Sequence, residues 1–401
     1  MADYADRPGY SFNPGPPPEA SRFLRNKGLT PSFTWADVEP EEHAVAFTVA
    51  KAMETDLLEA MRTEVQKALD GGQTFASFKK SWKSNPALSE WWGKREMTDP
   101  LTGEVKMVQL GSTRRLRTIY DANLRSARAA GQWERIERTK SAFPYLEYRL
   151  GPSERHRASH AAKEGLILPV ESAFWDSWMP PNGWGCKCWV RQVTAAEARR
   201  RGISAEPEIV DDIIENERTG ERKLVPRGLD PAWSRNPGRL RRQAMEAVLA
   251  EKIEALPAQA ARAAVRDIAT SWRADRVLFG RAPGAVPVAV LPKELADRVG
   301  SKVTVVHTTS EYGEKFQTRR RGVTTETLAA LQDALEAGQL YLDRVGEAPR
   351  LYVVSEGDKP WLYVLKVMRG NGEVWINSMY RLKPSKLAKI QSDPNIERLG
   401  N

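Results

Sequence analysis

Apolar residues recur every three or four positions over much of the first 140 residues, which is the spacing of amphipathic helices. The pattern predicts one long helix over Glu41–Asp70, ended by Gly71-Gly72. A second helix is predicted between Thr74, a suitable N-cap, and the breaker Asn85-Pro86. A third is predicted over Thr113–Thr139. We therefore expect the N-terminal part of the chain to be mainly helical.

Arginines crowd the polar faces of the predicted Thr113–Thr139 helix, opposite its leucine, isoleucine and alanine positions. Two interpretations stay open at this point. The arginines form an ordinary solvated face, or they bind an acidic protein surface. The residues are Arg114, Arg115, Arg117, Arg125 and Arg128.

Alternation of apolar and polar residues, the pattern of a half-buried strand, runs from Pro144 to Leu150. It places Leu146, Tyr148 and Leu150 on one face of the strand. Upstream, residues 98–103 read Thr-Asp-Pro-Leu-Thr-Gly, which predicts a turn at the tip of a hairpin or loop.

Short β-rich runs dominate the last 120 residues. Gly370-Asn371-Gly372 predicts a hairpin turn between the last two runs, and a helix is predicted over Thr325–Ala337. Together these features predict a small basic α+β domain with an antiparallel sheet. The β-rich runs are Val303–Val306, Leu351–Val354, Trp361–Val367 and Val374–Ile376.

Changes in pattern divide the chain into four parts, and the expected fold class is α+β. Residues 1–30, rich in proline and glycine, are expected to form a flexible arm. Residues 31–195 are expected to be helical at first and then to form a compact α+β unit. Residues 196–279 are expected to be a charged helical connector, and residues 280–401 the small antiparallel α+β domain.

Composition narrows the class of protein. The net charge of +9 favours polyanionic partners such as nucleic acid or an acidic protein surface. No run of about 18 apolar residues exists, so a membrane span is not expected, and Met1–Pro18 lacks the apolar core of a secretory signal. Two cysteines in 401 residues favour a reducing compartment over a disulfide scaffold.

The most distinctive stretch is residues 174–189, FWDSWMPPNGWGCKCW, which holds four of the thirteen tryptophans and both cysteines. Pro180-Pro181 bars a helix, and Asn182-Gly183 favours a tight turn. The aromatic residues and the forced turn predict a fixed, well-packed arrangement that presents Cys186 and Cys188.

A Cys-x-Cys pair on a turn is able to chelate a soft metal ion, and structural zinc takes about four Cys or His ligands. His160 is the nearest candidate partner for Cys186 and Cys188, and His156 stands four residues before it. Other interpretations stay open. The two thiols simply pack in a core, or one of them is a catalytic nucleophile with a histidine as its base; Asp176 is only a neighbour.

Residues 31–195 resemble the phage Mu F-like head-morphogenesis, or minor capsid, proteins. The resemblance is carried by Ser112–Gly131, Tyr145–Arg149, Ser159–Ala161 and, above all, the PPNGWGCKC motif of residues 180–188. His160, Cys186 and Cys188 fall on the family's His and Cys-x-Cys positions, whereas His156 is shared only by near relatives. Further matching segments are Leu168-Pro169 and Phe174–Asp176.

The resemblance implies a structural role in the head of a tailed phage. Such proteins are associated with the portal and the inner capsid, where they assist procapsid assembly or DNA packaging. We therefore expect the portal, the major capsid protein and packaged DNA or RNA as partners, no membrane, and a location in the virion after assembly in the host cytoplasm. A structural zinc ion is the one cofactor that the resemblance and the motif suggest.

Residues 303–386 weakly resemble a barnase/EndoU-like group of ribonuclease toxins, which implies an alternative function as a virion-carried nuclease or toxin. Candidate catalytic residues are Lys315, Lys366, Ser378 and Arg381, which would activate the 2′-hydroxyl and hold the phosphate. Arg320 stands where the group has a histidine. His307 is interpreted as a half-buried strand residue, and a degenerate nuclease kept as an interaction module is an equal alternative.

Overall fold

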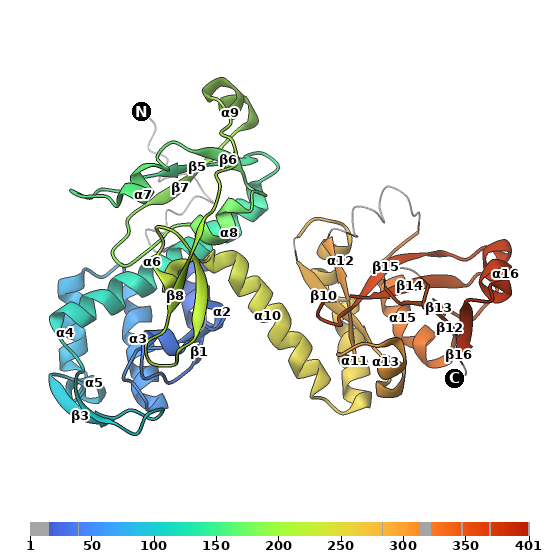
Figure 1. Ribbon diagram of the computed structural model, residues 1–401, viewed down its shortest axis with the longest axis horizontal. Helices are drawn as coiled ribbons and strands as arrows, with labels where there is room; N and C mark the ends of the chain where they lie inside the picture. The colour runs from blue at the N-terminus through green and yellow to red at the C-terminus, as the bar shows by residue number, and fades with distance from the viewer. Residues whose placement is uncertain are drawn as a thin grey trace, which may run out of the picture. The chain divides into compact units, whose positions relative to one another are not determined.

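In the computed structural model, the described residues are 16–38, 40–282, 284–310, 312, 322–345, 348–368 and 370–399. The chain divides into two compact units after Ala244. The boundary lies inside helix α10 (Pro237–Glu254). Residues 196–279, expected to be a charged helical connector, are divided between the two units, with residues 196–244 in the first and residues 245–279 in the second (Figure 1).

Helices build the N-terminal part of the first unit, as the apolar spacing predicts. Helix α6 (Thr113–Thr139) has the predicted bounds, and Ser112 caps its first turn. Thr74 caps α4 (Phe75–Ser84), and Asn85 caps the short α5 (Pro86–Ser89). These helices and α3 (Thr55–Asp70) enclose a core that includes Trp82 and Leu116, both fully buried.

The prediction of one continuous helix over residues 41–70 is wrong. Helix α2 (Pro40–Val45) leads into β2 (Ala46–Phe47), which pairs in parallel with β1 (Gly28–Leu29), and α3 begins only at Thr55. Lys51 adopts a φ of 71°, which no helix residue has. The backbone groups of this segment are thus used by strand pairing, which the apolar spacing does not reveal.

The prediction of a flexible arm over residues 1–30 is wrong for its second half. Pro18–Arg25 form helix α1, in which Ala20, Phe23 and Leu24 are buried in the same core as α3 and α6. Glu19 receives ion pairs from two α6 arginines, Arg135 and Arg138. The first fifteen residues lie outside the described part of the chain.

A three-stranded antiparallel sheet in the order β6-β5-β7 follows α6 (Figure 1). The predicted strand at residues 144–150 is confirmed as β5 (Tyr145–Arg149), with Leu146 and Tyr148 fully buried. Around it lie β6 (Ile167–Pro169), β7 (Trp189–Val193), α7 (Ala158–Ala161), α8 (Phe174–Trp178) and α9 (Ala195–Arg201).

Two hairpins complete the first unit. The predicted turn at residues 98–103 joins β3 (Lys94–Thr98) to β4 (Val105–Gln109), and β8 (Asp211–Glu215) pairs with β9 (Arg222–Pro226), a pair that the sequence did not predict. Arg218 joins the two turns, because its guanidinium donates to both carboxylate oxygens of Asp99 at 2.8 and 2.5 Å. Single-turn 3-10 helices η2 (Trp35–Asp37) and η3 (Pro231–Trp233) lie in the connecting segments.

The second unit is a seven-stranded sheet in the order β10-β11-β15-β14-β13-β12-β16. All its neighbouring strands are antiparallel except β11 and β15, which are parallel, so the predicted α+β fold class is confirmed. Its strands are β10 (Ala285–Val290), β11 (Val305–Thr309), β12 (Gln339–Asp343), β13 (Arg350–Val354), β14 (Trp361–Val367), β15 (Val374–Arg381) and β16 (Ile396–Leu399). Its helices beyond α10 are α11 (Ala258–Ala269), α12 (Trp272–Leu278), α13 (Lys293–Val299), α15 (Thr325–Ala337) and α16 (Pro384–Ser392).

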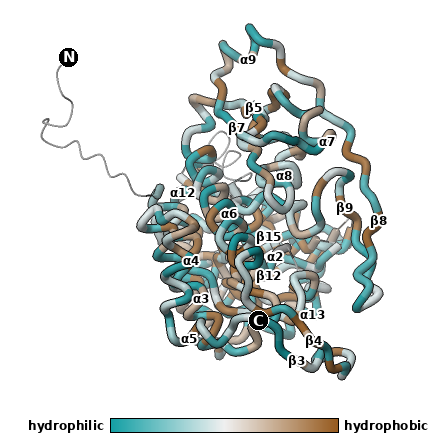
Figure 2. Tube along the Cα trace, turned by 90° about the vertical axis from the view of Figure 1, so that its left-hand side faces the viewer, coloured by the Kyte–Doolittle hydropathy of each residue, from teal (hydrophilic) through white to brown (hydrophobic). Residues whose placement is uncertain are grey.

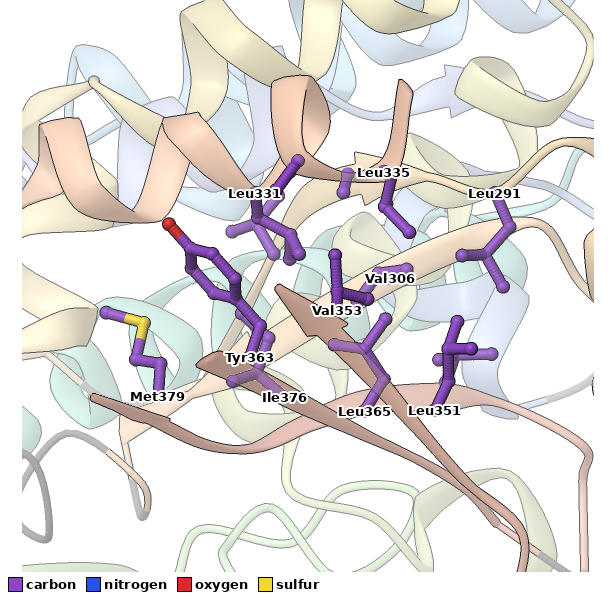
Figure 3. Close-up of a cluster of buried hydrophobic side chains, with 14 of the residues drawn as sticks. Leu291, Val306, Leu331, Leu335, Leu351, Val353, Tyr363, Leu365, Ile376 and Met379 are labelled. Carbon is purple, nitrogen blue, oxygen red and sulfur yellow. The ribbon is translucent and has the colours of Figure 1, made fainter. Parts of the chain in front are cut away.

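The core of this second unit lies between α15 and one face of the sheet. Figure 3 shows Leu331 and Leu335 of α15 above Val353, Tyr363 and Leu365 of the central strands. The predicted hairpin turn at residues 370–372 joins β14 to β15, with Gly372 at a φ of 74°. Further apolar residues fill the opposite face of the sheet beside α16.

Candidate functional site

Three elements of the first unit bring the side chains around the Cys-x-Cys turn together. Helix α7 carries His160, strand β5 carries Tyr148, and the turn before β7 carries Cys186 and Cys188. The structure places both sulfurs beside His160, whose Nδ1 is 3.8 Å from each of them.

The three ligand-type residues are largely shielded from water. His160 is 3% exposed and Cys186 8% exposed, and the three ligand atoms lie within 4.8 Å of one another. Burial makes a catalytic thiol at Cys186 a poor interpretation, because a nucleophile must be reached by its substrate. The arrangement instead suits an ion held inside the fold.

Hydrogen bonding fixes which imidazole nitrogen faces the sulfurs. Nε2 of His160 lies 3.2 Å from the carbonyl oxygen of Gly228, to which it donates its proton. The Nδ1 lone pair therefore points at Cys186 and Cys188. A carbonyl that orients the far nitrogen of a histidine is the usual outer partner of a metal-ligating imidazole.

The pKa values of the two thiols are shifted in opposite directions. The hydrogen bond from the Cys188 thiol lowers the pKa of Cys186, whereas the pKa of Cys188 is raised by its bond to Cys186 and by burial. Burial, and then the contact with Cys188, also raises the pKa of the Tyr148 phenol, whose hydroxyl donates to Asn182 at 2.9 Å. Cys186 is therefore the thiol that ionises first and the first sulfur that would bind a cation.

The distances fit a zinc ion. Zinc bonds of about 2.3 Å to sulfur and about 2.0 Å to nitrogen, at a tetrahedral angle, separate sulfur from nitrogen by about 3.5 Å. The observed separations of 3.8 Å need only a small adjustment. Within the described residues, the cluster supplies three protein ligands.

Aromatic packing holds the segment rigid, as its composition predicts. Trp175 is fully buried and donates from Nε1 to the carbonyl of Pro169, and Phe174 stacks on Trp178 at a centroid distance of 5.6 Å. The Trp178 ring meets the His160 ring edge-on at 5.9 Å. Trp184 and Trp189, in contrast, are 40% and 45% exposed.

Polar contacts tie the turn to distant parts of the unit. Arg125 of α6 donates to the carbonyl of Cys186 at 3.1 Å. Asp230 accepts from the backbone of Trp184 at 2.7 Å and from Arg157 at 2.9 Å. One of the five predicted α6 arginines is therefore structural at the site.

Two neighbours weighed from the sequence are not part of the cluster. His156 is exposed, and its Nε2 hydrogen-bonds to the carbonyl of Gly151 at 2.9 Å. Asp176 forms an ion pair with Arg239.

Sequence reasoning missed a charged cluster on the other face of β5. Glu147 is fully buried, and its carboxylate accepts from Arg191 and Arg201 at 2.6 Å and from Arg149 at 3.0 Å. Hydrogen bonds from Arg201 and the other two arginines lower the pKa of Glu147 to about 2. A glutamate inside a strand, with arginines two positions away and on the pairing strand, was the available signal.

The candidate nuclease residues of the second unit do not converge. Lys366 is paired with Trp375, whereas Arg381 is paired with Trp361 at the other end of β14, about 17 Å away at the rise of a strand. Ser378 lies between them, opposite Val364. Lys315 and Arg320 lie outside the described residues.

His307 is 9% exposed on β11 and faces Trp375 with ring centroids 5.2 Å apart. Burial lowers its pKa, so it is neutral at pH 7. The described residues of this unit therefore do not assemble a nuclease site.

Comparison with known proteins shows which family part of this chain resembles. Residues 59–191 match the family model described as "Phage Mu protein F like protein", within the expected range of 31–195. The predicted resemblance to the Mu F-like proteins is confirmed over these residues. The matched range holds α6, His160 and both cysteines.

Two curated relatives support the assignment. The "Putative capsid assembly protein F" of Escherichia phage Mu is 32% identical over 263 residues, 61% of this chain and 59% of that protein. The "Mu-like prophage FluMu F protein" of Haemophilus influenzae is 36% identical over 174 residues, 43% of this chain and 40% of that protein. The matches thus cover about two to three fifths of these relatives. No solved structure is significantly similar to this chain.

Within the described residues, no helix is both long enough and apolar enough to cross a bilayer.

Proposed function

We propose that this chain is a capsid assembly protein of a Mu-like tailed phage, which assists procapsid assembly and DNA packaging near the portal and remains in the virion. The observation that carries the proposal is the similarity to the Mu protein named as a putative capsid assembly protein, over 61% of this chain. The portal and the major capsid protein are the proposed protein partners. The net charge of +9 is compatible with packaged DNA nearby.

Exposed apolar side chains support a docking role. The β3–β4 hairpin exposes Val105 and Met107 at 61% each, and the β8–β9 hairpin exposes Leu224 at 69%. Figure 2 shows hydrophobic stretches in brown along both hairpins. Isolated two-stranded hairpins are marginally stable in water, and exposed apolar groups on them favour contact with another protein. The Arg218 bridge to Asp99 holds both hairpins in one place on the unit.

We further propose that His160, Cys186 and Cys188 hold a structural zinc ion. When bound, zinc would cross-link α7 to the turn before β7 and so fix the segment that carries the exposed Trp184. The oriented Nδ1 of His160 and the lowered pKa of Cys186 support this assignment. The ion has no catalytic part in the proposal.

The assembly function is tested in the phage that encodes the chain. Purified heads are analysed by mass spectrometry, and a null mutant is complemented with the wild type or with Cys186→Ser/Cys188→Ser. We expect the chain in wild-type heads, and few or no complete heads from the mutant or the double variant. Wild-type yields of heads that lack the chain would overturn the proposal.

A further inference from the structure

A second candidate site of the first unit does not include the cysteines themselves. It is a cavity of about 330 Å³ between the segment that follows α1, helix α6 and the loops around residues 184 and 233. Its walls combine aromatic rings with cations, and no carboxylate belongs to its lining as described. The lining includes Lys27, Trp35, His43, Arg115, Trp184 and Trp233.

The ammonium of Lys27 is the unusual feature of this cavity. Lys27 is 7% exposed, and its Nζ donates to the carbonyl of His43 at 2.6 Å. Burial and the nearby guanidiniums of Arg235 and Arg241 lower the pKa of Lys27 to about 7, and no acidic group offsets them. A buried cation without a carboxylate is costly to the fold, which makes it a candidate for a functional role.

His43 adds a hydrogen-bond acceptor beside that cation. Burial lowers the pKa of His43 to about 3, so the ring is neutral, and one ring nitrogen is bonded to the backbone of Trp35. Nε2 is buried and lacks a hydrogen-bond partner within the described structure. Lys27 and His43 thus bring a donor for an anion and an unsatisfied acceptor for an N–H group to the wall of one cavity.

The remaining polar groups argue against a phosphate. The Arg115 guanidinium donates to three backbone carbonyls, those of Ala50, Gln109 and Leu110. The other guanidinium of the lining, that of Arg235, donates from Nη1 to the carbonyl of Ala232, so neither arginine presents a fully free pair of N–H groups to a phosphate. No glycine lines the cavity, and phosphate cradles usually present several backbone N–H groups. The Lys27 ammonium, which keeps further N–H groups beside the one bonded to His43, and the Nε2 acceptor of His43 match a single carboxylate followed by an amide N–H.

The aromatic rim defines the rest of the ligand. Trp35 and Trp184 are 44% and 40% exposed, and Trp184 meets the buried Trp233 edge-on at 5.2 Å. Partly exposed indoles at the mouth of a cavity bind apolar or aromatic side chains well. Trp184 also belongs to the PPNGWGCKC motif, so the cysteine turn positions one wall of this cavity.

We propose that this cavity binds a peptide segment of a partner protein in which a carboxylate side chain stands next to an aromatic residue. The carboxylate pairs with Lys27, an amide N–H of the same segment donates to Nε2 of His43, and the aromatic ring lies against Trp184. That the ligand belongs to a partner protein rests on the proposed assembly function. The charge and the shape of the cavity are independent of that function.

The test uses the full chain and defined probes. Acetyl-Phe-Asp-Phe-amide, its neutral match acetyl-Phe-Asn-Phe-amide, and adenosine 5′-monophosphate are titrated while tryptophan fluorescence and ligand-observed NMR are followed. We expect the acidic peptide to bind at least tenfold more tightly than the neutral one. Equal affinity for both peptides, or tighter binding of the nucleotide, would overturn the proposal.

Variants distinguish binding in the cavity from general electrostatic attraction to a basic protein. Lys27→Met should abolish the preference for the acidic peptide, and Lys80→Met, which removes an exposed α4 lysine, should keep it. Trp184→Ala should weaken both peptides and provides the test if Lys27→Met does not fold. Unchanged binding in folded Lys27→Met, or in Trp184→Ala, contradicts the assignment. Peptide binding is measured without heads, so its failure is distinguishable from failure of the assembly function.

Discussion

One carboxylate organises the strand that carries Tyr148 to the cysteine site. Glu147 is fully buried between Arg149, Arg191 and Arg201, which are each about one third to two fifths exposed. The guanidiniums keep the glutamate ionised, and they tie β5 to β7 and α9. Alternation along β5 correctly predicted Leu146 and Tyr148 inside but treated Glu147 as an outward residue, because strand periodicity carries no information on the partners that α9 supplies.

Glu147→Gln should lower the free energy of unfolding by about 2 kcal/mol at pH 7, less than for a fully buried ion pair because the arginines reach water. The folded-state pKa of Glu147 is lowered from 4.5 to about 2. Its stabilisation is therefore complete above about pH 4.5 and is lost as the pH falls toward 2. Urea unfolding between pH 3 and 7 should show a flatter pH dependence in the variant. If the variant kept the wild-type dependence of unfolding free energy on pH, a group other than Glu147 would be responsible for that dependence.

At the scale of elements, the sequence predicted helices correctly where the signals lie within the helix itself. It failed where pairing with a distant segment determines the secondary structure. Helix α6 has the predicted bounds because its cap, Ser112, and its apolar spacing lie within the element. Residues 46–54 have similar spacing, yet β2 pairs with β1, eighteen residues away in the chain. The metal-type cluster was predictable because its three residues have distinctive chemistry, whereas the cavity around Lys27 is formed by segments that no motif connects.

The close contact between α1 and α6 predicts that a glycine-to-alanine change within a helix destabilises the protein, which is the opposite of the usual effect. Gly131 lies in α6 where an added Cβ would be 2.8 Å from the backbone nitrogen of Ala20. Glycine to alanine inside a helix normally stabilises by about 1 kcal/mol. Here Gly131→Ala should destabilise by about 1–2 kcal/mol, because a backbone atom of α1 must move. Chemical denaturation measures the change, and a stabilised variant would mean that α1 does not dock on α6.

At the scale of the whole molecule, the two units have separate cores and separate roles in this account. The cysteine site, the two hairpins and the cavity all belong to the unit that ends at Ala244. The sheet of the second unit is covered by helices of that same unit. The division inside α10 was not predictable, because a continuous helix gives no compositional boundary. We therefore expect the two units to unfold separately.

Calorimetry of the full chain should resolve two transitions, and chelation of metal should affect only one of them. If the ion contributes about 3 kcal/mol, its removal lowers the Tm of the first unit by roughly 6–12 °C. The transition of residues 245–401 should not move. His160→Ala should reproduce the chelator's effect, whereas His156→Ala, outside the cluster, should not. A shift of both transitions, or of neither, would contradict a structural ion confined to the first unit.

The central claim is that His160, Cys186 and Cys188 form a structural metal site that organises the Mu F-like domain. Native mass spectrometry of freshly prepared, unchelated full-length protein tests it most directly, with elemental analysis of the same sample. The account predicts one zinc ion per chain in the wild type and in His156→Ala, and none in Cys188→Ser. A wild-type chain that carries no zinc after purification in zinc-supplemented medium would contradict it.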